Sequence, residues 1–64
     1  MDPNANLSAM RTIAQALVDM DPDTAPASVI AMNAARLAEL ALAMDEWIRG
    51  GGFLPDAWQQ ASKG

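Results

Sequence analysis

Residues 26–49 carry two apolar stripes side by side, and this doubled pattern constrains the fold more than any other feature of the chain. Both stripes repeat at alternating steps of three and four residues, which is the spacing of a coiled-coil seam. The bulky stripe comprises Ile30, Asn33, Leu37, Leu40, Met44 and Trp47, and the alanine stripe comprises Ala27, Ala31, Ala34, Ala38 and Ala41. One neighbouring helix cannot cover both stripes, so a helix here needs more than one partner.

A second amphipathic helix is predicted over about residues 3–20. Its apolar residues recur at spacings of three and four and so share one face; they are Leu7, Met10, Ile13, Ala14, Leu17 and Val18. Asp2 and Pro3 suit the N-cap and the first helical position, although Asn6 or Ser8 would cap a later start.

Prolines interrupt the chain between the two helices. Pro22 and Pro26 each remove a backbone donor and push the preceding residue out of the α region, which places a linker at residues 21–25. So short a linker makes the helices antiparallel neighbours. We expect Asp23 or Thr24 to cap the second helix, which runs over about residues 26–49.

A run of glycines ends the second helix, and an aromatic tail follows it. Residues 50–52 form a corner, because glycine readily adopts the left-handed conformation just past a helix end, and a short helix is predicted over about residues 55–61. With Leu54 as its N-cap, Phe53 and Trp58 occupy the two positions of a hydrophobic staple. The aromatic side chains either close the core or anchor a partner. The predicted partner-binding residues are Trp47, Phe53, Leu54 and Trp58.

The small size of the chain favours self-association. With 64 residues, no cysteine and no histidine, neither disulfides nor the usual zinc ligands can stabilise a small core. We therefore predict one all-α domain over residues 1–64, an antiparallel helical hairpin with a short C-terminal helical tail. The hairpin is expected to assemble as a dimer, forming a four-helix bundle, or as a higher oligomer. In the alternative, the tail folds back over the uncovered stripe and completes a three-helix core within one chain.

The oligomer interface is expected on the second helix. Asn33 would be either a satisfied core amide or a polar residue that fixes the register of an oligomeric seam. The predicted interface residues are Ile30, Asn33, Ala34, Leu37, Ala38, Leu40, Ala41 and Met44.

Groups that catalyse reactions or bind metals are scarce. Asp19, Asp21 and Asp23 resemble the opening of a calcium-binding loop, but Thr24 replaces its invariant glycine and Ile30 its bidentate glutamate. General acid–base catalysis needs a tuned group in a recognisable constellation, and the chain offers none. We expect a protein that is not an enzyme and that uses neither a metal nor a cofactor.

Charge and hydropathy restrict the partners. The net charge of −4 disfavours binding to nucleic acid or to anionic lipid. The longest uncharged stretch, residues 24–35, has 12 residues, fewer than the roughly 20 that a membrane-spanning helix needs. No basic region precedes an apolar stretch near Met1, so we expect no signal peptide, no membrane partner and a cytoplasmic location.

The run Leu42–Trp58, LAMDEWIRGGGFLPDAW, resembles the ending of short helical proteins encoded by actinobacteria and their phages. In those proteins a helix finishing in an L-D-x-W-like pattern meets G-G-x-L-P-x-x-W, and here Met44 stands where leucine is expected. The resemblance covers about the last third of the chain. It implies a phage accessory protein that binds a host or phage macromolecule or a signalling molecule, and it carries over no catalytic residue.

Two functions follow as hypotheses. In the first, an oligomeric interaction protein presents an apolar edge around Trp47, Phe53 and Trp58 to a host or phage protein. In the second, an oligomer captures a nucleotide signal at a subunit interface, where symmetry multiplies each arginine around a shared pocket. The candidate anion-binding residues are Arg36 and Arg49, with Arg11 a further basic residue. Both candidates also have acidic neighbours at helical spacing, which predicts surface ion pairs.

Overall fold

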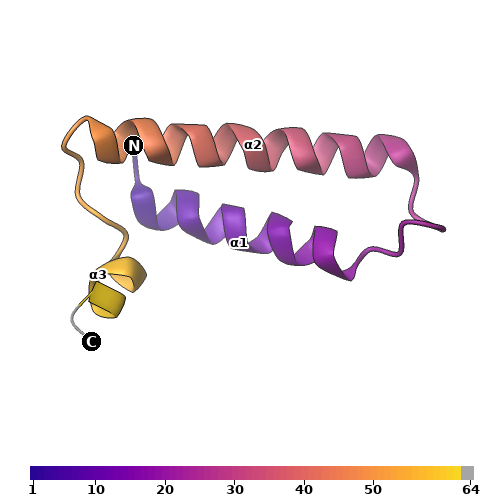
Figure 1. Cartoon of the computed structure of the whole chain (residues 1–64), viewed down its shortest axis with the longest axis horizontal. Helices are drawn as coiled ribbons and strands as arrows, with labels where there is room; N and C mark the ends of the chain where they lie inside the picture. Colours follow the sequence, from indigo (N-terminus) through magenta and orange to yellow (C-terminus); the bar gives the residue numbers. More distant parts are fainter. Residues whose placement is uncertain (63–64) are drawn as a thin grey trace.

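The computed structural model describes the backbone of residues 1–62 and the side chains of residues 1–59. The elements in this part of the chain are α1 (Pro3–Asp19), α2 (Ala27–Arg49) and α3 (Asp56–Ser62). α1 and α2 pack side by side as an antiparallel hairpin, and α3 lies at the end where α1 begins and α2 ends (Figure 1). The prediction of an all-α helical hairpin is confirmed; residues 63–64 of the predicted domain lie outside the described residues.

Local signals set the beginning of α1. The Asp2 carboxylate accepts hydrogen bonds from the backbone N–H groups of Asn4 and Ala5 at 3.0 and 3.2 Å, so Asp2 is the predicted N-cap. Pro3 occupies the first helical position, where its missing N–H costs nothing. Asn6 and Ser8 lie inside the helix, so the alternative of a later start is wrong.

The beginning of α2 differs from expectation. Pro26 is the N-cap and, within the described chain, no side chain bonds to the first turn, so the prediction that Asp23 or Thr24 caps α2 is wrong. The Asp21 carboxylate instead accepts the N–H of Asp23 at 2.9 Å and so closes a turn inside the linker. Pro26 is extended, with ψ of 136°, and it separates this turn from the helix. The capping oxygens therefore stay upstream of the N–H groups that they were expected to bind.

The bulky stripe of α2 forms the core of the hairpin. Leu40 and Met44 retain only 8% and 2% of their exposure, and Leu7 of α1 is buried with them. The Asn33 amide donates to the carbonyl oxygen of Val29 at 2.8 Å, which makes it a satisfied amide within its own helix. The other residues of the stripe are half-buried, so α1 covers this side of α2 incompletely.

The alanine stripe remains uncovered. All of its residues, from Ala27 to Ala41, are exposed in the described structure. α3 turns toward the start of α1, where the backbone N–H of Asp56 donates to the side-chain oxygen of Asn4 at 2.8 Å. The alternative in which the tail covers the stripe of α2 is therefore wrong, because this hydrogen bond holds the beginning of the tail helix against α1.

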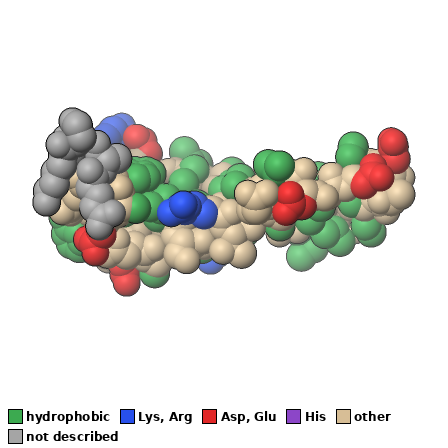
Figure 2. All heavy atoms as spheres, turned by 90° about the horizontal axis from the view of Figure 1, so that it is seen from below, with side chains coloured by type: hydrophobic (Ala, Val, Ile, Leu, Met, Phe, Trp, Pro, Cys, Tyr) green, Lys and Arg blue, Asp and Glu red, His purple; other side chains and the backbone are tan. Residues whose placement is uncertain are grey.

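The hairpin is elongated for its length. Its radius of gyration is 13.8 Å, whereas a compact domain of this size has about 11 Å. Its accessible surface is 4552 Å², against about 4,000 Å² for a compact protein of this mass. Hydrophobic side chains lie at the surface along much of the hairpin (Figure 2). One chain by itself therefore leaves apolar area in water that a compact fold would bury.

By length and composition α2 satisfies the criteria for a membrane-spanning helix. It has 23 residues, and the mean hydropathy of its most apolar window is 1.3. α2 meets these criteria although its uncharged run is short, because alanine-rich turns on both sides of Arg36 and Glu39 raise its mean hydropathy. The core helices of water-soluble proteins meet the same criteria, so length and composition do not assign this chain to a membrane.

Candidate functional site

The candidate site lies at the end of the hairpin where α2 stops, and we call it the aromatic end: Trp47, Phe53, Leu54 and Trp58. These residues come from the last turns of α2, the loop after the glycine corner and α3. The N-terminus lies at the same end (Figure 1), where Met1 lines a hollow together with Trp47 and the glycines at 50–52. Segments far apart in the sequence are thus brought together here.

Trp47 holds the loop against α2. Its indole N–H donates to the carbonyl oxygen of Phe53 at 2.9 Å, and the two rings meet edge to face with centroids 5.6 Å apart and planes at 85°. Edge-to-face aromatic pairs are worth about 0.5–1.5 kcal/mol beyond their buried area. Trp47 is half-buried and its polar group is satisfied, so it acts as the support on which Phe53 is placed.

The glycines of the corner have different roles. Gly51 adopts the left-handed conformation, with φ of 93°, which confirms the expectation for this corner. Gly52 donates its N–H to the carbonyl oxygen of Trp47 at 2.9 Å, and a Cβ at Gly52 would overlap the indole of Trp47. The sequence shows three adjacent glycines without distinguishing them. The requirement at Gly52 arises only from the tryptophan that packs on it.

The substitution Gly52→Ala is therefore expected to destabilise the aromatic end, at a cost of about 1–3 kcal/mol for overpacking. The added methyl group has to displace the indole, so the hydrogen bond from Trp47 to Phe53 is lost with it. Thermal unfolding followed by circular dichroism measures the loss. Gly50→Ala is the matched control, since Gly50 has φ of −80° and its Cβ would come no nearer than 3.3 Å to a neighbour. Equal stability of the two variants would contradict the close packing at Gly52.

The N-cap of α3 differs from the predicted one. Pro55 is the cap, because its carbonyl oxygen accepts the N–H groups of Trp58 and Gln59, both at 3.0 Å. The prediction of Leu54 as N-cap is wrong, and the hydrophobic staple between Phe53 and Trp58 falls out of register by one residue. Phe53 packs on Trp47 instead, because the glycine corner folds it back over the end of α2.

The aromatic end leaves apolar surface in water. Phe53 is 58% exposed and Trp58 is 38% exposed, whereas Trp47 and Leu54 are half-buried. At the same end of the hairpin is an open hollow of about 590 Å³, lined by Met1, Ala43, Glu46, Trp47 and the glycines at 50–52. The hollow has an aromatic wall and one carboxylate. Such an arrangement can receive an apolar or weakly basic side chain, and it does not assemble a general acid with a general base.

The residues of the predicted oligomer interface fall into three groups by their exposure. Leu40 and Met44 are buried inside the hairpin, so these two residues are not accessible to a second chain and are removed from the interface. Ile30, Asn33 and Leu37 are half-buried in the same stripe. The exposed members are Ala34, Ala38 and Ala41. The interface prediction included the bulky stripe because the sequence does not state which stripe faces α1.

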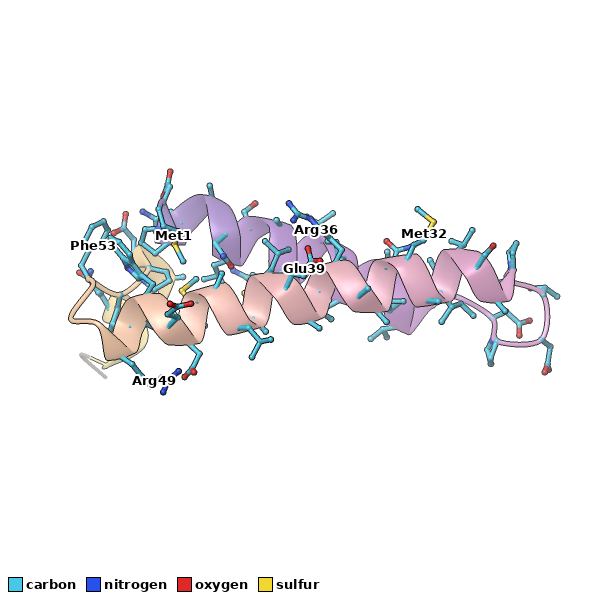
Figure 3. All side chains as sticks on the ribbon, turned by 90° about the horizontal axis from the view of Figure 1, so that it is seen from above. Met1, Met32, Arg36, Glu39, Arg49 and Phe53 are labelled. Atoms are coloured by element: carbon cyan, nitrogen blue, oxygen red, sulfur yellow. The ribbon has the colours of Figure 1, made fainter. Side chains whose placement is uncertain are left out.

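The candidate anion-binding arginines lie beside acids of their own helix. Arg36 pairs with Glu39 at 3.6 Å, and Arg49 pairs with Asp45 at 3.0 Å, as the helical spacing predicts. Arg36 and Arg49 point to opposite sides of α2 (Figure 3), so one chain does not bring them to one ligand. Arg11 lines a second hollow of about 290 Å³ between α1 and α3.

The acidic side chains around the linker accept hydrogen bonds from the backbone and from a neighbouring side-chain amide. Asp21 accepts the N–H of Asp23, and Asp19 accepts a hydrogen bond from the side chain of Gln15 at 3.0 Å. Among the described residues, no three His, Cys, Asp or Glu side chains lie close enough to hold a metal ion. The geometry of this segment is that of a helix end and a turn.

Comparison of the chain with models of protein families, with curated proteins and with solved structures finds no match. The functional proposal therefore rests on the geometry of the aromatic end and of the exposed face of α2.

Proposed function

We propose that this chain is a non-catalytic, self-associating interaction protein that binds a target protein through its aromatic end. The observation that carries the proposal is the exposure of Phe53 and Trp58 at the same end of the hairpin as an open hollow lined by Trp47. Tryptophan is enriched among the residues that dominate binding energy in protein interfaces. Large aromatic side chains are costly to leave in water, and a partner surface would remove that cost.

Pre-organisation supports the same function. The hydrogen bond and ring contact between Trp47 and Phe53 place the phenyl ring before any partner arrives. The hydrogen bond between Asp56 and Asn4 positions the start of the helix that carries Trp58. Rigid anchors lose less conformational entropy on binding than mobile ones do, so more of the contact energy remains as affinity.

The proposed target is a host or phage protein. The resemblance of residues 42–58 to short proteins of actinobacteria and their phages supports the role of an accessory factor. A cytoplasmic location remains our proposal, on the absence of cysteine.

The nucleotide-sponge hypothesis draws less support from the described residues. Arg36 and Arg49 each lie beside a carboxylate, and neither of the two hollows includes them. A rise in melting temperature with cyclic or linear nucleotides, lost on substitution of either arginine by alanine, would favour that hypothesis over protein binding.

Trp58→Ala tests the proposed function. We expect the substitution to weaken capture of the target by at least about 2 kcal/mol, or roughly 30-fold, as for other interface hot spots. The melting temperature should fall only modestly, because Trp58 is not buried in the hairpin core. Capture from host extract and thermal unfolding are measured on the same preparation.

The matched control is Val18→Ala, which removes an exposed apolar side chain at the opposite end of the hairpin. It should leave both capture and melting temperature unchanged. Capture that survives Trp58→Ala, or that is lost equally with Val18→Ala, would contradict target binding through the aromatic end.

A further inference from the structure

The exposed side of α2 offers a continuous apolar face, which we call the alanine face: Ala27, Ala31, Ala34, Ala38 and Ala41. Leu42 lies four residues after Ala38 and therefore borders this face, and it is 70% exposed. The face thus combines small residues, which let a second backbone approach closely, with a bulky side chain at its edge. It runs along most of a helix of 23 residues.

One chain exposes more surface than a compact protein of its mass, which favours a second copy as the cover of the alanine face. The accessible surface of 4552 Å² exceeds that of a compact protein of this mass by roughly 550 Å². A standard protein interface buries about 800 Å² on each partner. A helix packed along the alanine face would remove an area of this order, and it would supply the second layer that the hairpin lacks.

Charge indicates the direction in which a second copy lies. Acids occupy the linker before α2, at Asp21 and Asp23, whereas the last turns of α2 carry Arg49 together with Asp45 and Glu46. In a parallel arrangement each of these groups would lie opposite the same group of the other chain, so the linker acids would face linker acids and Arg49 would face Arg49. In an antiparallel arrangement Arg49 of one copy approaches the linker acids of the other.

The start of α2 favours the same direction. α2 begins at Ala27 after the N-cap Pro26, and in the described structure no side chain caps its first N–H groups at the positive end of its dipole. Asp45 lies on the alanine face one turn before Arg49, and the two are paired at 3.0 Å. Antiparallel docking brings this carboxylate to the uncapped start of α2 in the other copy.

We propose that a second copy of this chain docks antiparallel on the alanine face, centred between Ala34 and Ala38. In this register Ala34 of one copy lies opposite Ala38 of the other, and Ala31 lies opposite Ala41. The same register places Asp45 opposite Ala27, and Arg49 past the start of α2 in the other copy, toward its linker. The proposal rests on the self-association in the proposed function, and it adds the face, the direction and the register.

Cysteine cross-linking tests the register directly, because the chain has no cysteine of its own. The variants Ala31→Cys and Ala41→Cys are made separately, and each is oxidised alone and in an equal mixture. A disulfide forms only when the two Cα atoms lie within about 7 Å. In the proposed register, residue 31 lies opposite residue 41 of the other copy and about 15 Å along the axis from residue 31 of that copy.

We expect a disulfide-linked dimer from the mixture on a non-reducing gel, and little from either variant alone. Ala34→Cys mixed with Ala38→Cys should link in the same way. Ala16→Cys, at an exposed alanine of α1, is the control and should not link to Ala31→Cys. Linking of Ala31→Cys with itself would show a parallel pair and overturn the proposal.

Sedimentation of the unmodified chain separates this proposal from the proposed function. More than one chain per particle without a link between residues 31 and 41 overturns the antiparallel register and leaves self-association standing. A monomer at micromolar concentration overturns self-association itself, whereas target binding is tested separately by Trp58→Ala. Flotation of the monomer with phosphatidylcholine vesicles would assign the face to lipid and overturn the second copy as its occupant.

Discussion

Leu40→Asp should abolish the helical fold of this protein. Leu40 lies in the small core of the hairpin, where it is 8% exposed, and α1 packs over that side of α2. Burying an unpaired carboxylate costs on the order of 3–5 kcal/mol, in addition to the lost packing of the leucine. The free energy of unfolding of a small domain is only a few kcal/mol, so a loss of this size exceeds it. Circular dichroism at 25 °C should therefore show loss of helix, and sedimentation should show an unfolded monomer.

The control for this prediction is Met32→Asp. Met32 is on the same helix, but it is 71% exposed and points away from the hairpin in Figure 3. An aspartate there stays in water and lies four residues before Arg36, which favours an ion pair. Met32→Asp should keep the helical signal. A folded Leu40→Asp variant, or equal damage from both variants, would show that the bulky stripe does not form the core.

The second large effect is expected from Trp47→Ala. The change removes the indole that packs on Gly52, the hydrogen bond to Phe53 and the edge-to-face ring contact. Truncation of a tryptophan costs about 3–5 kcal/mol when buried, and the half-burial of Trp47 places the expected loss near the lower end. Thermal unfolding should show a melting temperature well below that of Trp58→Ala, and the loop after the glycine corner should become sensitive to protease.

Trp47→Phe is the intermediate variant at this position. It keeps one aromatic ring but removes the N–H donor together with part of the indole that packs on Gly52, so the loss should exceed the roughly 1 kcal/mol of one hydrogen bond and stay below that of Trp47→Ala. If Trp47→Phe were as damaging as Trp47→Ala, a single aromatic ring would contribute nothing at this position. If Trp47→Ala were as stable as the unmodified chain, the support that we assign to Trp47 would be wrong.

Much of the helical layout was predictable because it depends on neighbours in the sequence. Asp2 and Pro3 start α1 through contacts within one turn, and the glycine corner at residues 50–52 ends α2. The alternation of three and four predicted two apolar stripes on α2, since residues at that spacing share one face of a helix, but it did not show which stripe faces α1.

The two N-cap predictions were wrong because the position of a helix start depends on backbone geometry that residue types alone do not show. Asp23 and Thr24 are good capping residues by chemistry, and Leu54 precedes a proline that was expected at the first helical position. In both cases the proline itself became the cap, at Pro26 and at Pro55. A shift of one residue at each helix start depends on backbone angles, and small energy differences decide them.

The sequence by itself determined the helices, their approximate ends, the antiparallel hairpin and the two apolar stripes of the second helix. Only the tertiary structure decided that α3 turns to Asn4 of α1, that Gly52 has to be glycine beneath Trp47, and that Phe53 stays exposed. The physical reason is the range of the interactions involved. Helix formation and termination depend on contacts within a few residues, whereas the place of the tail depends on a hydrogen bond between residues 52 positions apart, which no local pattern encodes.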